Sequence, residues 1–313
     1  MSTRYKGDGW PPRSSSSSLI PGSVFRVDVI YTTFIGELGV HAWTLLLQVA
    51  SAFCNLYVVK MFFGMCCRYL ICPTIAFVVL TLVLLKISQR FREFFFARIS
   101  FSVLGPLLGK AFEGLRKAIM QELDNLESYD VQLKKANSIR VLEVGIGPGA
   151  NFPFISREIH LIAVDPNVSF ESSLVKNLAA HPNIHLERLV AALGEDMHEI
   201  PDCSVDVVVL THVLCSVMDA KNVLSESKRV LVPGGKLLFM EHVAYSEGSW
   251  ILLAQKLLDP LWQLLACGCH LNRSSGEDIK NAGFSQTQIN VVDLPIISVV
   301  KRNIFGVATK GAD

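Results

Sequence analysis

The chain from Val29 to Leu85 is almost free of charged residues. Its three charges in 57 residues are Glu37, Lys60 and Arg68. Two stretches within it carry no charge at all, residues 38–59 and residues 69–85. As helices they would extend about 33 and about 26 Å, whereas the hydrocarbon core of a bilayer is about 30 Å thick. This pattern predicts a hydrophobic membrane-anchoring region over residues 29–99.

The second apolar stretch is the better candidate, because residues 75–85 are nearly all aliphatic. We predict the best membrane span over residues 69–88. The stretch at 38–59 contains more polar side chains, and it either spans, lies in the membrane interface or pairs with the second stretch as a hairpin. Lysine and arginine dominate residues 86–98, and such a basic flank places the rest of the chain in the cytosol. Residues 1–28, with five consecutive serines, are expected to form a disordered polar tail.

Downstream of the basic flank, the apolar pattern changes from a helical period to an alternation of strand-like and helix-like runs. Steps of three and four from Leu108 to Leu126 predict an amphipathic helix within residues 100–136. Five buried strands are expected at 140–144, 159–164, 184–189, 205–210 and 236–240, with helices at 169–180 and 220–230. Helices at 250–265 and 276–282 and strands at 287–292 and 303–310 follow. Over residues 137–313 this alternation predicts an α/β, Rossmann-like fold, with a doubly wound, mostly parallel sheet and helices on both faces.

The overall composition adds two constraints. The 313 residues include 29 basic and 28 acidic side chains, a formal charge of +1, and 18% charged residues, against about 25% in ordinary soluble domains. Outside residues 29–85 the share is 54 of 256, so the shortfall lies mostly in the predicted anchor. A net charge so close to zero also argues against nucleic acid as a partner.

A glycine-rich turn carries the strongest chemical signal. The strand that ends at Val144 runs into glycines at alternate positions of residues 145–149, where missing side chains let a ligand approach the backbone. The turn also fits the dinucleotide-binding pattern, with Asp165 at the right distance to hold a ribose, so a dinucleotide-dependent enzyme stays open. Glu143, the position of the third glycine and the Pro-Gly-Gly turn at 233–235 favour S-adenosylmethionine as the cofactor.

The eight cysteines show no zinc-knuckle spacing. Cys267, Cys269 and His270 would suit a soft metal, but two thiols and a histidine without a second cluster are more often packing residues. We therefore predict no metal site.

Seven motifs carry a resemblance to a known family that covers residues 94–310. They are residues 143–152, 165–167, 190–198, 212–217, 229–235, 239–243 and 258–262. Together they resemble the methyltransferase-like protein 7 family of membrane-anchored thiol S-methyltransferases. The resemblance implies a class I methyltransferase with a seventh, antiparallel strand, an anchor in endoplasmic reticulum and lipid-droplet membranes, a cytosolic catalytic domain and methyl transfer to thiols. The chain departs from the family in an extension before about Met61, an inserted Leu193, and Cys267-Gly268-Cys269 in place of Asp-Gly-Cys.

The resemblance also implies roles for individual residues. Glu143 would hold the amino-acid end of the cofactor, and Gly145, Gly147 and Gly149 would line its methionine and ribose. Asp165, with Pro166 and Asn167, would bind the ribose. Glu195, Asp196 and Met197 would lie beside the adenine, and Thr211 near the sulfonium. The candidate catalytic residues are His242, which would assist deprotonation of the thiol, and His212. The structural alternatives are a helix cap for Asp165 and non-catalytic, hydrogen-bonded rings for both histidines.

The acceptor side is less strongly specified. We interpret residues 250–267 as an apolar lid that can also touch lipid, with an ordinary core helix as the alternative. A free thiol with a pKa of about 8.5 is partly ionised at neutral pH, so a strong general base is optional. The expected function is S-adenosylmethionine-dependent methylation of small apolar thiols at the cytosolic face of a membrane, with membrane lipids as partners. Two alternatives stay open: a methyltransferase for a lipid, quinone or other apolar molecule, and a cofactor-binding membrane scaffold with little catalysis.

Overall fold

The computed structural model describes the backbone of residues 25–312 and their side chains, those of residues 25–38, 104 and 106–108 excepted. The chain divides into one unit that ends at Phe77 and a second that begins at Val78. The predicted polar tail, residues 1–28, lies outside the described residues except for its last four, which are helical.

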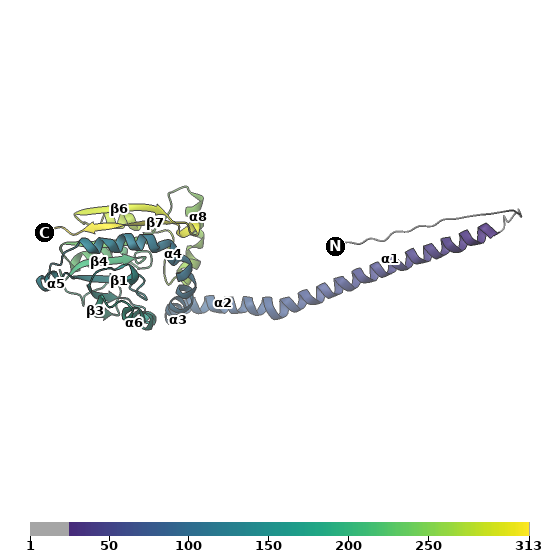
Figure 1. Ribbon diagram of the computed structural model, residues 1–313, viewed down its shortest axis with the longest axis horizontal. Helices are drawn as coiled ribbons and strands as arrows, with labels where there is room; N and C mark the ends of the chain where they lie inside the picture. Colours follow the sequence, from purple (N-terminus) through teal and green to yellow (C-terminus); the bar gives the residue numbers. More distant parts are fainter. Residues whose placement is uncertain (1–24, 313) are drawn as a thin grey trace, which may run out of the picture. The chain divides into compact units, whose positions relative to one another are not determined.

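The described residues of the first unit are helical. They form α1 (Phe25–Cys66), a π-helical turn (Cys67–Ile71) and the start of α2 (Cys72–Ile87) (Figure 1). Within the described chain, residues 39–87 form the one helical run that is long and apolar enough to cross a membrane. Both predicted spans, 38–59 and 69–88, lie in this run to within one residue, and the helical backbone is continuous between them, so they do not form a hairpin. Its apolar side chains are exposed, as at Trp43 (66%), which is unusual for a helix that meets water.

The second unit begins with helices. They are α3 (Gln89–Phe95), a π-helical turn (Phe96–Ser100), α4 (Phe101–Met120), a 3-10 turn (Gln121–Asn125) and α5 (Val131–Lys135). The Ser88 hydroxyl caps α3 by accepting a hydrogen bond from the Phe91 N–H (3.2 Å), and the Asp130 carboxylate caps α5. The amphipathic helix predicted within residues 100–136 is therefore divided, because residues 126–130 are not helical.

Seven strands form one sheet in the order β3-β2-β1-β4-β5-β7-β6. They are β1 (Ile139–Val144), β2 (Ile159–Val164), β3 (Ile184–Val190), β4 (Val205–Thr211), β5 (Leu231–His242), β6 (Gln286–Asp293) and β7 (Arg302–Thr309). All pairs are parallel except those of β7, which is antiparallel to β5 and β6. The predicted Rossmann-like fold with an antiparallel seventh strand is confirmed. Six strands match the predicted ranges to within one residue; β5 is longer, because it pairs with β4 on both sides of an irregularity at residues 233–235.

Helices cover both faces of the sheet. They are α4 and α6 (Glu171–Ala179) on one face and α7 (Ala220–Val230) and α9 (Ser275–Lys280) on the other, with α8 (Trp250–Leu265) between β5 and α9 in the chain. Phe112 and Ile119 of α4 pack against the same cluster as Val141 of β1, whereas Leu142 packs in the cluster of α7. Since side chains alternate along a strand, Glu143 lies on the α4 side.

Candidate active site

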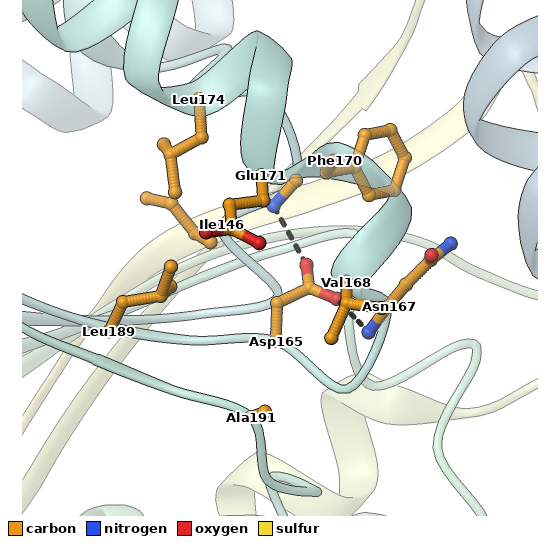
Figure 2. Close-up of a pocket in the computed structure, with 10 residues that line it drawn as sticks. Ile146, Asp165, Asn167, Val168, Phe170, Glu171, Leu174, Leu189 and Ala191 are labelled. Carbon is orange, nitrogen blue, oxygen red and sulfur yellow. Dashed lines mark hydrogen bonds between the residues drawn. The ribbon is translucent and has the colours of Figure 1, made fainter.

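The turn after β1 faces the end of β2 at the carboxyl edge of the parallel strands. Gly145, Gly147 and Gly149 have φ angles of +68°, +53° and +81°, the left-handed region that favours glycine. The Gly147 N–H donates a hydrogen bond to Asp165 Oδ2 (2.8 Å), and the Asn167 N–H donates to Asp165 Oδ1 (2.8 Å). Figure 2 shows how this carboxylate joins the two turns.

A cavity of about 150 Å³ lies beside this carboxylate. Its polar lining includes Asp165, Asn167 and Glu171, whereas Pro166 is exposed outside it. The apolar lining residues are Ile146, Val168, Phe170, Leu174, Leu189 and Ala191. A carboxylate has about four acceptor positions, and the backbone uses two of those of Asp165. Burial raises the pKa of Asp165, and the hydrogen bonds from Asn167 and Gly147 oppose this rise.

Three residues expected beside the adenine are not among those that line the cavity. Met197 is 1% exposed and packs in the core on the α7 side of the sheet. Its backbone N–H donates to Glu226 Oε2 (2.9 Å), and its place beside the adenine stays a prediction. Asp196 is exposed. Glu195 Oε1 accepts hydrogen bonds from two backbone N–H groups at residues 218 and 219 (2.7 and 3.4 Å), and Glu195 Oε2 is buried without a hydrogen-bond partner among the described residues.

A buried polar network lies behind the glycine turn. Glu143 is 2% exposed, and its Oε1 accepts a hydrogen bond from Asn151 Nδ2 (2.8 Å). The same amide group donates to Thr211 Oγ1 (3.0 Å), while Asn151 Oδ1 accepts from Arg116 of α4 (2.7 Å). Burial raises the pKa of Glu143 to about 8, against the hydrogen bond from Asn151 and the charge of Arg116. Arg116 and Asn151 were not expected from the sequence, where 35 positions separate them.

The two predicted catalytic histidines lie at the ends of β4 and β5, with ring centroids 5.9 Å apart. His212 has a φ of +58°, its ring contacts Phe112, and its Nε2 lies 3.3 Å from Asn303 Oδ1. Burial, with a contribution from His242, lowers the pKa of His212 to about 3, so its ring is neutral at physiological pH. His242 Nε2 lies 2.9 Å from Cys269 Sγ. Burial acts to lower the pKa of His242, but the negative charge of Cys269 raises it overall.

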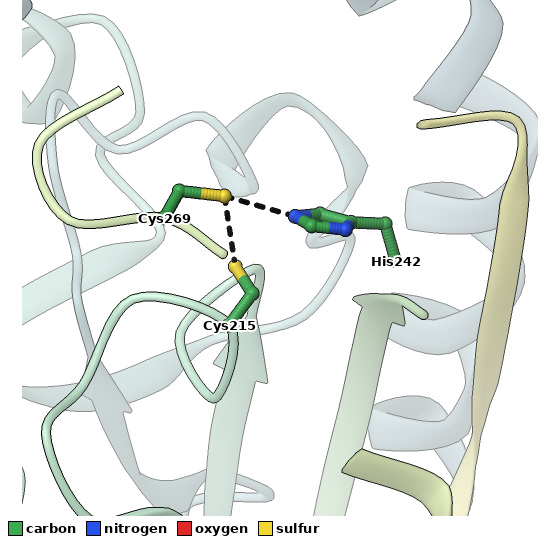
Figure 3. A group of neighbouring side chains, drawn as sticks. All are labelled: Cys215, His242 and Cys269. Atoms are coloured by element: carbon green, nitrogen blue, oxygen red, sulfur yellow. Dashed lines mark hydrogen bonds between the residues drawn. The ribbon is translucent and has the colours of Figure 1, made fainter. Parts of the chain in front are cut away.

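His242 forms a cluster with two cysteines from separate loops (Figure 3). Cys269 Sγ lies 3.4 Å from Cys215 Sγ and 3.4 Å from Trp262 Nε1. Cys215 is buried and Cys269 is partly exposed. Hydrogen bonding with Cys215, together with the neighbouring His242, holds the pKa of Cys269 well below its usual range, and the pKa of Cys215 is raised. The ligand-type atoms of Cys215, His242 and Cys269 all lie within 4.8 Å of one another.

Two buried carboxylates shape the loops that carry these cysteines. Glu241, which is 0% exposed, accepts hydrogen bonds from the backbone N–H groups of residues 213–215 at 2.8, 2.9 and 3.3 Å. Asp259 of α8 accepts one backbone N–H from the loop after α8 (2.7 Å), and its Oδ2 lies 3.1 Å from His270 Nδ1. His270 therefore turns to Asp259, and the fold groups Cys269 with residues distant in the sequence.

The chain is similar to known proteins in sequence and in fold. The family described as a methyltransferase domain matches residues 142–239. Human thiol S-methyltransferase TMT1A is 43% identical over 176 residues, 56% of this chain and 72% of that protein. Human thiol S-methyltransferase TMT1B is 38% identical over 210 residues, 67% of this chain and 84% of that protein. The crystal structure of the YcgJ protein from Bacillus subtilis matches with a TM-score of 0.47 at 15% identity, over 63% of this chain and 99% of that one.

Proposed function

The chain belongs to the methyltransferase-like protein 7 family of thiol S-methyltransferases, and on this premise we propose that it methylates the sulfur of apolar thiols at the cytosolic face of a membrane. It is an S-adenosylmethionine-dependent methyltransferase. The observation that carries the proposal is the glycine turn joined to Asp165 beside a cavity, in a chain whose relatives are named for thiol methylation.

The residues at the carboxyl ends of β1 and β2 fit the cofactor. A Cβ at Gly147 would meet no atom within 4 Å, so this part of the turn borders open space. We assign the ribose hydroxyls to the remaining acceptor positions of Asp165 and the adenine to the apolar wall that contains Phe170 and Leu189. The Glu143 network lies behind the turn and would fix the region of the amino-acid end. When bound, S-adenosylmethionine supplies a methyl group on a sulfonium sulfur.

The remaining cofactor-binding residues are assigned from where they lie in the site. Gly145 and Gly149 give the turn its left-handed backbone, and Asn167 holds the turn after β2 through its N–H on Asp165. Thr211, hydrogen-bonded to Asn151 at the end of β4, is our assignment nearest the sulfonium. Glu195, with an unpartnered buried oxygen, is retained at the outer edge of the site.

The acceptor thiol would approach from the ends of β4 and β5. The thiol sulfur forms the new S–C bond as the C–S bond of the sulfonium breaks, and the thiol proton must leave. His212 is a poor base, because its pKa is about 3. We retain His242, which lies against Cys269, as the residue that assists loss of this proton. Positioning supplies much of the remaining rate, and a dry site favours a reaction in which thiolate and sulfonium charges disappear.

An exposed apolar face on α8 supports an apolar acceptor and contact with a membrane. Trp250, Leu253 and Leu257 are 70%, 59% and 72% exposed, whereas Gln255 and Asp259 on the same helix are buried. Such a face is suited to lipid or to an apolar ligand rather than to water. With the apolar helical run of residues 39–87, it supports membrane anchoring, and the family resemblance leads us to place the enzyme at the endoplasmic reticulum and lipid droplets.

The proposed activity is tested with membranes that contain the full chain. They are incubated with S-adenosylmethionine labelled in its methyl group and with one of three acceptors: thiophenol, its matched oxygen analogue phenol, or membrane lipids. We expect label in thiophenol and none in phenol. Label in phenol or in lipid, and never in a thiol, would refute the thiol assignment, and cofactor binding without any transfer would favour a scaffold.

The proposed location has a separate test. The full chain is expected to stay with endoplasmic reticulum membranes and lipid droplets after alkaline carbonate extraction. Replacement of several leucines and valines in residues 75–85 by serine is expected to release it. Release of the unmodified chain by carbonate would contradict membrane spanning.

A further inference from the structure

Cys215, His242 and Cys269 bring two thiols and an imidazole together beside the proposed acceptor position. We propose that these three residues bind one zinc ion and leave a fourth coordination position, to which the acceptor thiol binds as a thiolate. Binding of the ion follows from the cluster alone, whereas coordination of the thiol rests on the proposed function.

The donor atoms are those that zinc prefers, at nearly the separations that zinc requires. With Zn–S of about 2.3 Å and Zn–N of about 2.0 Å, a tetrahedral site places two sulfurs about 3.8 Å apart and a sulfur and a nitrogen about 3.5 Å apart. In the structure Cys215 Sγ and Cys269 Sγ are 3.4 Å apart, and His242 Nε2 is 2.9 Å from Cys269 Sγ. Outward shifts of about 0.4–0.6 Å would therefore admit the ion.

The surroundings hold the two sulfur donors in place, whereas His242 Nδ1 is buried without a hydrogen-bond partner among the described residues. The Trp262 indole N–H points at Cys269 Sγ (3.4 Å), and Ser216 Oγ lies 3.4 Å from Cys215 Sγ, so each sulfur has a neighbouring group that can donate to a thiolate. Outer partners of this kind orient metal ligands and tune the bound metal. Glu241 fixes the backbone of the Cys215 loop through three N–H groups. Such a preorganised set is more than a pair of cysteines needs for packing alone.

The number of protein ligands indicates a reactive site. Structural zinc sites have four protein ligands, whereas catalytic sites have three and one open position, and two cysteines with one histidine form a known catalytic set. His242 ends β5, beside the His212 ring at the end of β4. A thiol in the fourth position releases its proton to solvent and keeps a sulfur lone pair for the methyl carbon. His242 would then assist deprotonation as a ligand of the ion.

The binding half is tested on the reduced, full-length chain in detergent. We expect about one zinc per chain by elemental analysis, and titration of the metal-free chain with Co²⁺ should give a thiolate-to-cobalt charge-transfer band. Cys269→Ser should lower Co²⁺ affinity by more than about 100-fold, and Trp262→Phe, which removes the indole N–H together with part of the ring, by about 10-fold. Cys267→Ser, two positions from Cys269, is the matched control and should bind like the unmodified chain. No charge-transfer band, or equal affinity in Cys267→Ser and Cys269→Ser, would overturn zinc binding, and the first result needs no variant to fold.

The coordination half uses the same cobalt-loaded chain. Thiophenol is expected to shift the charge-transfer band, and phenol is expected to leave it unchanged. In a separate assay, removal of the metal by a chelator should lower the rate of thiophenol methylation at least about 10-fold, and adding Zn²⁺ should restore the rate. Full activity in the metal-free chain would overturn this inference and leave thiol methylation standing. Failure of every form to methylate thiols, with the metal bound, would instead refute the proposed function.

Discussion

A single methyl group at Gly149 tests the packing of the glycine turn. A Cβ built at this position would lie 2.4, 2.7 and 2.8 Å from three ring atoms of Phe152, whose side chain is 0% exposed. Gly149 also has a φ of +81°, which costs an L-residue about 1–2 kcal/mol. Overpacking of a filled core adds about 1–3 kcal/mol. Gly149→Ala should therefore lose about 2–5 kcal/mol, a large share of the stability of an ordinary domain.

Gly147→Ala is the matched control. Gly147 has a φ of +53°, but its Cβ would meet no atom within 4 Å, so only the backbone cost of about 1–2 kcal/mol applies. Thermal unfolding of the full chain in detergent, without cofactor, should place Gly149→Ala about 4–20 °C below the unmodified chain and clearly below Gly147→Ala. Cofactor affinity should fall in Gly147→Ala, because the added methyl enters the open space beside Asp165. Equal melting temperatures for the two variants would refute the packing argument.

Three further changes test the polar groups of the cofactor side. Asp165→Asn should weaken S-adenosylmethionine binding about 10–100-fold by calorimetry, since hydrogen bonds to a charged group are each worth about 1.5–3 kcal/mol, whereas Asp124→Asn, at an exposed carboxylate outside the cavity lining, should not. Arg116→Met should lower the unfolding free energy by about 1–3 kcal/mol in urea, because it leaves the buried Asn151 Oδ1 without its hydrogen-bond donor. Burial raises the pKa of Glu143 in the folded state to about 8, so the folded protein keeps this proton at a pH where the unfolded chain has lost it. The free energy of unfolding therefore falls as pH rises from about 4.5 to about 8. Glu143→Gln should remove this part of the pH dependence of the urea midpoint, and an unchanged profile would contradict the assigned pKa.

The strands were predictable because most of them are buried on both faces. A strand of this kind reads as an apolar run that a turn ends, as in residues 159–164 and 205–210. β5 was predicted too short because Pro233, Gly234 and Gly235 interrupt its run. The ladder continues past them, since tertiary pairing with β4 outweighs the local preference for a turn.

The cofactor-binding residues could be predicted from the sequence for a related reason. Its residues follow directly on the strands, and the parallel order of β1 and β2 brings Gly147 and Asp165 together at one edge. Met197 follows β3 in a loop, where no periodicity indicates which way a side chain points, and its side chain packs in the core rather than along the cavity. The cysteine cluster joins residues 27 and 54 positions apart, and only the course of two loops sets that distance.

The helix α8 shows what an amphipathic pattern leaves undecided. Its period separates two faces, and the ordinary rule buries the apolar one. Here Gln255 is 0% exposed and donates to the carbonyl oxygens of Val243 and Val299 (3.3 and 2.9 Å), while Trp250 and Leu257 face outward. A buried amide with its hydrogen bonds satisfied is tolerated in a core, whereas an outward row of large apolar side chains is unfavourable in water. Leu252 is also buried (5% exposed), so the inner face of α8 mixes apolar and polar side chains while a row of large apolar side chains stays outside. We propose that this outer row meets lipid or an apolar acceptor, which favours the lid over the core helix among the two interpretations of the sequence.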